Sequence, residues 1–196
     1  LEAGGWGGRI ADARAHSLKR IENSEKRIIT TATPLRSLHT LAREGRRELA
    51  CPAIGVTGST GKTSTKDILL ALLRPRLNAH ANRENLNTEV GLPLSILEAE
   101  PGTEALVLEM AMRGVGQIAE LVAIAEPDVG VIVNVGPVHL ELLGSIEALA
   151  ATKAELIAGL PPGGTAGIPA RARPLDPLLL DHVTIVTFCP GGDVDD

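Results

Sequence analysis

Between an apolar segment and a segment with helical periodicity lies the run Thr57-Gly58-Ser59-Thr60-Gly61-Lys62-Thr63-Ser64. Residues 53–57 before it predict a buried strand, and residues 63–73 predict a helix. Glycines at such a junction let successive backbone N–H groups turn toward an anion, and a helix N-terminus favours negative charge. Lys62 and Thr63 open the expected helix, where an ammonium suits phosphate and a hydroxyl suits Mg²⁺. The run therefore indicates a phosphate-binding loop.

The strict pattern for such loops would place its first glycine at position 56, where this chain has Val56. The rest of the pattern is present in the strand-to-helix setting that the chemistry requires. A solvent-exposed turn rich in glycine, serine and threonine is the alternative interpretation. We expect the nucleotide contacts to come from Gly58, Ser59, Thr60, Gly61, Lys62, Thr63 and Ser64.

Outward from this loop, short β-branched segments alternate with longer segments rich in alanine and leucine. Strands are expected at residues 53–57, 77–81, 105–109, 129–135 and 183–188. Helices are expected at residues 33–48, 63–73, 88–99, 115–125 and 145–160. This alternation predicts an α/β fold of P-loop type, with a doubly wound, mostly parallel sheet and helices on both faces. Ligands bind such a sheet at the carboxyl ends of its strands.

Composition narrows the class of protein further. The 196 residues are 44% hydrophobic and carry a formal net charge of -5. An acidic chain with 1% aromatic residues lacks the basic surface and the stacking platforms of a nucleic-acid-binding protein. No apolar run approaches the ~18 residues needed to span a bilayer. We expect a cytoplasmic protein with no membrane insertion, in which Cys51 and Cys189 are reduced thiols.

The first quarter of the chain differs from the remainder, because it is rich in basic residues and has few long apolar runs. We interpret residues 1–49 as a remnant or linker that leads into the main domain, residues 50–196.

Two further strand ends carry polar side chains that suit a ligand site. Glu109 ends the strand expected at residues 105–109, where a buried carboxylate is costly unless it meets a cation. Mg²⁺ is the natural partner, because it prefers oxygen ligands, although a salt-bridged or capping glutamate is the alternative. After the strand expected at 129–135 comes the segment Asn134-Val135-Gly136-Pro137-Val138-His139-Leu140-Glu141, whose His139 is unremarkable by itself.

Two more candidates remain open from the residues alone. The segment Asn85-Leu86-Asn87-Thr88 leads into a helix, so Asn87 or Thr88 is either a helix cap or, with Asn85, a substrate contact. Lys153 lies inside the helix expected at 145–160, and its residue type favours a solvent-exposed lysine.

Taken together, these segments resemble the central ATP-binding domain of the Mur ligases, which build the stem peptide of peptidoglycan. The resemblance covers residues 54–164 and includes the phosphate loop, Asn85-Leu86-Asn87-Thr88-Glu89-Val90-Gly91-Leu92-Pro93, Leu108-Glu109-Met110 and the segment from Asn134 to Glu141. In this family the first glycine of the loop is commonly absent. The segments are most similar to the branch that adds D-alanyl-D-alanine to UDP-N-acetylmuramoyl-tripeptide.

The resemblance implies that residues 1–49 are the remnant of an N-terminal substrate domain with its linker, and that residues 50–196 are the central ATP-binding domain, incomplete at its C-terminal end. It also implies a role for each candidate residue. Thr63 and Glu109 would hold one Mg²⁺ beside the ATP phosphates, and His139 would bind a second. Lys153 matches the family lysine that becomes carbamylated, and Asn134 would contact the nucleotide. ATP would phosphorylate the tripeptide carboxylate, and the dipeptide amine would displace phosphate from the acyl phosphate. Lys62, His139 and Lys153 are then the catalytic candidates, in a protein expected to be a monomer.

Three other interpretations compete with this one. A ligase similar to folylpolyglutamate synthase would share the loop, the histidine and the carbamylated lysine. A P-loop kinase or GTPase belongs to another class, but the chain lacks the Asn-Lys-x-Asp guanine motif. A truncated ATP-binding module without catalytic activity is the third.

Overall fold

The sheet contains six strands, all parallel, in the order β4-β5-β3-β6-β7-β8. A computed structural model describes residues 11–12, 30–83, 85–137 and 144–189. The strands are β3 (Ala53–Thr57), β4 (Ala79–Ala81), β5 (Ala105–Glu109), β6 (Val129–Ile132), β7 (Thr165–Pro169) and β8 (Thr184–Phe188). Two-residue strands β1 (Ala11–Asp12) and β2 (Thr30–Thr31) pair separately. The α/β prediction is confirmed.

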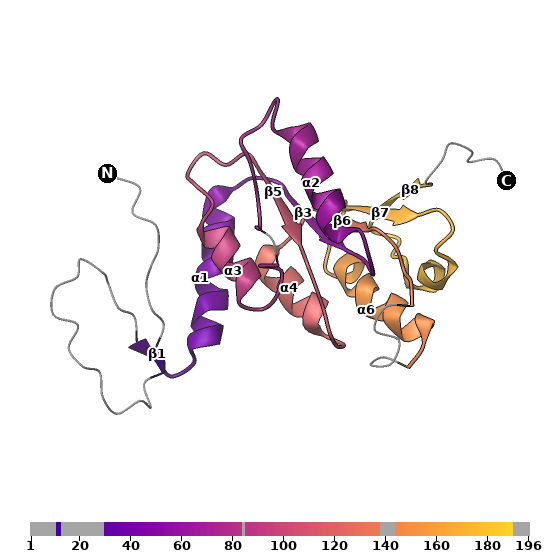
Figure 1. Ribbon diagram of the computed structural model, residues 1–196, viewed down its shortest axis with the longest axis horizontal. Helices are drawn as coiled ribbons and strands as arrows, with labels where there is room; N and C mark the ends of the chain where they lie inside the picture. Colours follow the sequence, from indigo (N-terminus) through magenta and orange to yellow (C-terminus); the bar gives the residue numbers. More distant parts are fainter. Residues whose placement is uncertain (1–10, 13–29, 84, 138–143, 190–196) are drawn as a thin grey trace.

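Helices cover both faces of the sheet, as predicted (Figure 1). Helix α2 (Lys62–Leu73) packs on β3, β4 and β5 from one side. The other side carries a layer made of α1 (Pro34–Leu49), α3 (Gly91–Leu97), α4 (Gln117–Ala125) and α6 (Ile146–Ala158), with the 3₁₀ helix η1 (Arg173–Leu178) beside α6. Among the described residues, no helix combines the length and the apolarity needed to cross a bilayer.

Two glycines in the central strands let helix α6 approach the sheet closely. A Cβ on Gly55 would lie 2.9 Å from Leu156 Cδ1, and one on Gly130 would lie 3.0 Å from Leu156 Cγ. Leu156 is fully buried, a contribution of about 1.5–3 kcal/mol for a leucine side chain. Because α6 packs this tightly, the side chains along its inner face are held close to the carboxyl edge of β3.

Several predicted boundaries were wrong, and each has a local cause. The strand expected at 129–135 ends at Ile132, because the chain then turns toward the loop after β3. The helix expected at 88–99 begins only at Gly91, whose Cα approaches Leu86 so closely that a Cβ would lie 2.5 Å from Leu86 Cα. Strand β7 was missed, since its sequence Thr-Ala-Gly-Ile-Pro has weak strand propensity and depends on pairing with β6 and β8.

Candidate functional site

The loop between β3 and α2 lies at the carboxyl edge of the sheet. Gly61 adopts a φ of 75°, a left-handed conformation that glycine takes without strain. Gly58 lies against the chain that follows β6, where a Cβ would sit 3.0 Å from Val133 Cβ. Lys62 Nζ folds back over the loop and donates to Gly58 O at 3.0 Å. This lysine thus lies beside the loop from which it is expected to reach a phosphate.

Asn134 holds the loop in shape. Its Oδ1 accepts hydrogen bonds from the backbone N–H groups of Ser59 and Thr60, each at 3.0 Å, and its Nδ2 donates to Thr60 O at 3.1 Å. Ser59 Oγ adds a second link, because it donates to Gly136 O and accepts from Gly136 N, both at 2.9 Å. Asn134 thus bonds to the loop after β3, and Ser59 of that loop bonds to the segment after β6. The sequence did not indicate this mutual support.

Glu109 and Thr63 meet beside this loop, as expected from the two strand ends. Thr63 Oγ1 donates to Glu109 Oε2 at 2.8 Å, and Asn87 Nδ2 donates to Glu109 Oε1 at 2.8 Å. Glu109 is 2% exposed, and a buried carboxylate with a hydroxyl neighbour is the oxygen-rich set that Mg²⁺ prefers. The side chains present thus fit a Mg²⁺ ion. Asn87 contacts this carboxylate and does not cap α3, whose N-cap is Val90, and its expected contact with substrate stays a prediction.

Behind Glu109 lies a pair of buried polar residues that the sequence analysis missed. Asn82 follows β4 and bonds to the backbone of Glu109, while Lys66 of α2 donates to Asn82 O at 2.8 Å. One signal existed in the sequence, since a lysine four positions after Lys62 falls on the same face of the helix. Nothing in the sequence distinguished Asn82 from a loop asparagine.

Lys153 is buried, so the expectation of a solvent-exposed lysine was wrong. It is 2% exposed, on the inner face of α6. Burial, and secondly the positive charge of Lys62, lower the pKa of Lys153 from 10.5 to about 8. Two lysines from distant parts of the chain therefore lie close enough to repel, which suits an anion between them. A cue was available in the sequence, because apolar residues flank Lys153 on its side of the helix.

The remaining candidates have mixed outcomes. Ser64 is exposed in the first turn of α2, and Asn85 is exposed in the loop before α3. Thr88 is half-buried, and its carbonyl oxygen accepts the N–H of Leu92 at 2.9 Å. His139 lies outside the described residues.

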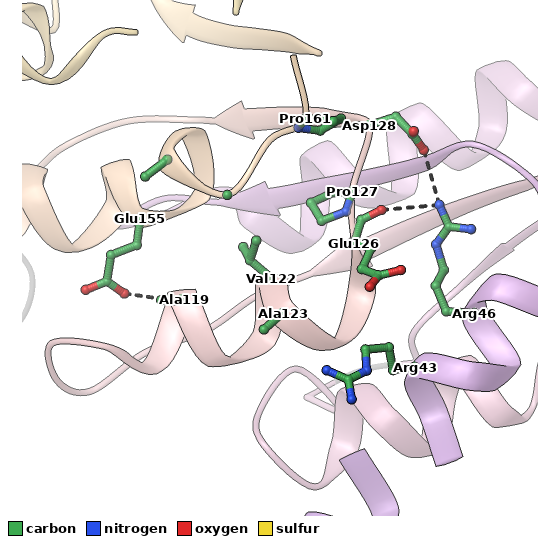
Figure 2. A pocket seen from close by; sticks show the side chains of 12 residues that line it. Arg43, Arg46, Ala119, Val122, Ala123, Glu126, Pro127, Asp128, Glu155 and Pro161 are labelled. Carbon is green, nitrogen blue, oxygen red and sulfur yellow. Dashed lines mark hydrogen bonds and ion pairs between the residues drawn. The ribbon is translucent and has the colours of Figure 1, made fainter. Parts of the chain in front are cut away.

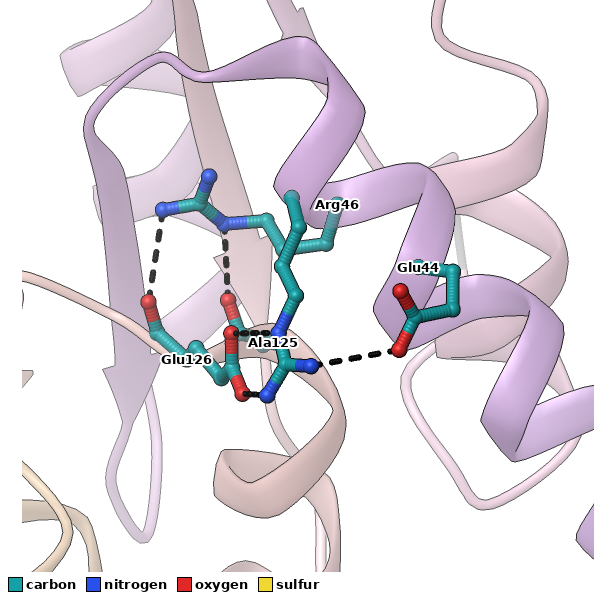
Figure 3. Close-up of polar contacts among 5 residues, drawn as sticks. Glu44, Arg46, Ala125 and Glu126 are labelled. Atoms are coloured by element: carbon teal, nitrogen blue, oxygen red, sulfur yellow. Dashed lines mark hydrogen bonds and ion pairs between the residues drawn. The ribbon is translucent and has the colours of Figure 1, made fainter.

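The helical layer opposite α2 contains a cavity of about 810 Å³, lined by residues of α1, α4 and α6 and reaching Asp128 just before β6 (Figure 2). Arg46 on its rim is 7% exposed and donates to Ala125 O, Glu126 O and Asp128 Oδ2 (Figures 2 and 3). Glu155 accepts hydrogen bonds from the backbone N–H groups of Gly116 and Ala119, at the start of α4. These charges connect helices to each other, and none of the predicted site residues that the structure describes lines this cavity.

The fold and the carboxyl-edge site together define a P-loop-type α/β domain. The Mur ligase middle domain matches residues 56–180 of this chain, which is more than half of its length. The chain belongs to the Mur ligase family.

Relatives by sequence include two proteins named UDP-N-acetylmuramoyl-tripeptide–D-alanyl-D-alanine ligase. The one from Synechocystis sp. is 48% identical over 126 residues, which are 64% of this chain and 28% of the relative. The one from Bacillus subtilis is 42% identical over 137 residues, or 70% of this chain and 30% of the relative. The chain thus spans less than one third of the length of these curated relatives.

Solved structures give the same family. The MurF ligase from Thermotoga maritima in complex with ADP has a TM-score of 0.78 at 40% identity, covering 87% of this chain and 40% of that one. MurF from Acinetobacter baumannii has a TM-score of 0.76 at 27% identity, covering 84% and 37%. A folylpolyglutamate synthase from Mycobacterium tuberculosis is 17% identical with a TM-score of 0.63, a likeness of fold alone.

Proposed function

We propose that this chain is the nucleotide-binding part of an ATP-dependent ligase of peptidoglycan synthesis. Its reaction joins D-alanyl-D-alanine to UDP-N-acetylmuramoyl-tripeptide, as in the names of the relatives at 48% and 42% identity. The observation that carries the proposal is the contact between Thr63 and Glu109, because it unites the first residues of the loop helix with the acidic end of β5. Likeness to folylpolyglutamate synthase supports the fold and not that substrate.

The roles of the residues follow from their positions. Lys62 and the backbone N–H groups around Gly61 and Thr63 bind the phosphates of ATP, where positive charge offsets the charge gathering on the transferred oxygens. Thr63 and Glu109 hold Mg²⁺, and His139 is proposed for a second ion. When bound, Mg²⁺ neutralises phosphate charge and orients the phosphoryl group. Asn134 acts by holding the loop open for the phosphates.

Lys153 is proposed to carry a carbamate. A pKa of about 8 leaves an appreciable fraction of neutral amine near pH 7, and the neutral amine is the nucleophile. The Lys153 ammonium first loses one proton, and the neutral nitrogen then attacks the carbon of CO₂ and releases a second proton. The two steps together replace a positive charge that Lys62 repels with a negative one. The product is a second anionic oxygen donor near the Mg²⁺ site.

We further propose the division of the chain into residues 1–49 and 50–196, since the family match at 56–180 falls inside the second unit. A monomeric, cytoplasmic protein is proposed with it. The complete ligation is proposed for a protein of the relatives' length, in which the tripeptide carboxylate takes the γ-phosphoryl group and the dipeptide amine then displaces phosphate. For this chain, nucleotide binding is the activity to test.

Calorimetric titration of the 196-residue chain with Mg·ATP tests the proposal directly. We expect saturable binding by the wild type and its loss in Lys62→Ala. The matched control is Arg74→Ala, which removes an exposed cation at the opposite end of α2 and leaves binding unchanged. Circular dichroism establishes that all three proteins fold. A folded wild type that gives no heat of binding contradicts the proposal.

A further inference from the structure

The side chain of Asn82 forms hydrogen bonds with both backbone polar groups of Glu109. Its Oδ1 accepts the N–H of Glu109 at 2.8 Å, and its Nδ2 donates to Glu109 O at 3.0 Å. Because a backbone N–H can only donate and a carbonyl can only accept, this pairing fixes the orientation of the amide. The Asn82 side chain thus continues the β4–β5 hydrogen-bond pattern by one further residue, at the point where β4 has ended.

The same amide also anchors the loop that follows β4. Asn82 Nδ2 donates to Leu86 O at 2.8 Å, one residue before Asn87. Asn87 in turn donates through Nδ2 to Glu109 Oε1, and its carbonyl accepts the N–H of Ala111. One side chain therefore sets both the backbone of Glu109 and the donor that orients its carboxylate.

Helix α2 is tied to this arrangement by Lys66. Lys66 Nζ donates to Asn82 O at 2.8 Å, and Lys66 and Asn82 are only 4% and 1% exposed. Thr63 lies one turn earlier on the same helix and contacts Glu109. Buried polar groups that satisfy one another in this way are rigid, since each lost bond leaves a desolvated partner.

We propose that Asn82 is a positioning residue for the divalent cation site, and that Lys66 assists it from helix α2. Asn82 keeps the Glu109 carboxylate within hydrogen-bond distance of Thr63. It also keeps Asn87 on Oε1, so that Oε2, the oxygen beside Thr63, would be available to a cation. The inference rests on the proposed function, because it assumes that the cation accompanies a bound nucleotide. Substitutions behind a metal ligand typically cost about tenfold to a hundredfold in metal affinity.

The test is the Mg²⁺ dependence of ADP binding, measured by calorimetry on the 196-residue chain with EDTA and across a Mg²⁺ titration. For Asn82→Ala we expect ADP affinity in EDTA to match the wild type, while the Mg²⁺ concentration that gives half of the enhancement rises about tenfold or more. Asn82→Asp keeps the acceptor for Glu109 N and loses both donations, so we expect an intermediate rise. Lys66→Met is expected to give the smallest rise of the three.

The matched control is Asn78→Ala. Asn78 donates through Nδ2 to Gly102 O at the other end of the β4–β5 pair. The substitution therefore removes an asparagine hydrogen bond that does not involve Glu109. Equal Mg²⁺ dependence in Asn82→Ala and the wild type overturns the positioning role and leaves the proposed function standing. If neither Asn82 variant folds, the positioning role is also overturned, because Asn82 is then required for folding itself. A wild type that binds no ADP overturns the proposed function and this inference together.

Discussion

The two edges of the sheet use buried charge in opposite ways. At the amino edge, Arg46 is matched by Asp128 and by the carbonyl oxygens that end helix α4. At the carboxyl edge, Lys153 and Lys62 repel one another, and Glu109 is held by neutral donors rather than by a cation. The charges of the first edge are paired within the protein, whereas those of the second edge would be neutralised by the ions proposed above.

This comparison shows why cavity size is a poor guide to function in this chain. The cavity of about 810 Å³ lies among helices α1, α4 and α6, where Arg46 and Glu155 already bond to backbone groups of neighbouring helices. The phosphate loop offers backbone N–H groups and a lysine on an open edge. The candidate site is distinguished by side chains and backbone groups that suit an ion, and not by the volume it encloses.

The largest effect is expected from a substitution at the proposed cation site of the carboxyl edge. Glu109→Gln should abolish the Mg²⁺ enhancement of ADP binding, a greater loss than the about tenfold to hundredfold of a residue behind the ligand. The amide keeps one acceptor for Thr63 or Asn87, so the fold should survive. Calorimetry at several Mg²⁺ concentrations measures the loss. An unchanged Mg²⁺ response would contradict the assignment of a cation site to the carboxyl edge.

Arg46→Ala addresses the amino edge. It removes three hydrogen bonds, leaves the carbonyl oxygens at the end of α4 without the Arg46 donor and leaves Asp128 with the N–H of Ala53 but no cation. We expect the free energy of unfolding to fall by about 3 kcal/mol, the lower end for breaking a buried ion pair, since the Asp128 side chain is 51% exposed. Urea denaturation followed by circular dichroism gives the value. ADP affinity of the folded variant should stay at the wild-type level; a parallel loss would mean that the edges are coupled.

Lys153→Met tests the buried charge of the carboxyl edge through the pH dependence of stability. The pKa of Lys153 is about 8 in the fold against 10.5 as the ordinary value, so the unfolded chain binds more protons between these pH values. Wild-type stability relative to the variant should therefore rise with pH across this window, and below about pH 8 the methionine variant should be the more stable. Urea denaturation in CO₂-free buffer on both sides of the window tests this, with Arg74→Met as the control. Parallel pH profiles would contradict it.

The same variant tests the carbamate. With ¹³C-labelled bicarbonate, the wild type should give a carbamate carbon signal in the NMR spectrum, and Lys153→Met should not. A signal of equal intensity in both proteins would place the carbamate on another amine.

Arg47→Ala is expected to have the smallest effect. Arg47 follows the buried Arg46 and pairs with Glu126 and Glu44 on the surface. The Arg47 guanidinium lowers the pKa of Glu126, but exposed ion pairs contribute little to stability. We expect a urea midpoint within error of the wild type. A loss comparable to that of Arg46→Ala would show that burial is not what separates these two arginines.

Much of the fold was predictable because its signals are local. The β-branched residues of β3 and β5 and the Gly-rich junction before α2 mark a parallel strand and a helix start wherever they occur. Strand β7 was not predictable from its own residues, since its ladder with β6 and β8 outweighs its glycine and proline. The ends of β6 and α3 depended likewise on contacts with distant segments.

The sequence by itself determined the glycine-rich loop between a strand and a helix, the α/β class and the placing of Glu109 at a strand end, because each depends on neighbouring residues and on a regular period. Only the tertiary structure decided that Lys153 is buried beside Lys62, that Asn134 supports the loop and that Asn82 holds Glu109. These contacts join residues 27 to 91 positions apart. No local pattern encodes such a separation, and only the packing of α6, β5 and the loop after β6 at one edge of the sheet brings those side chains together.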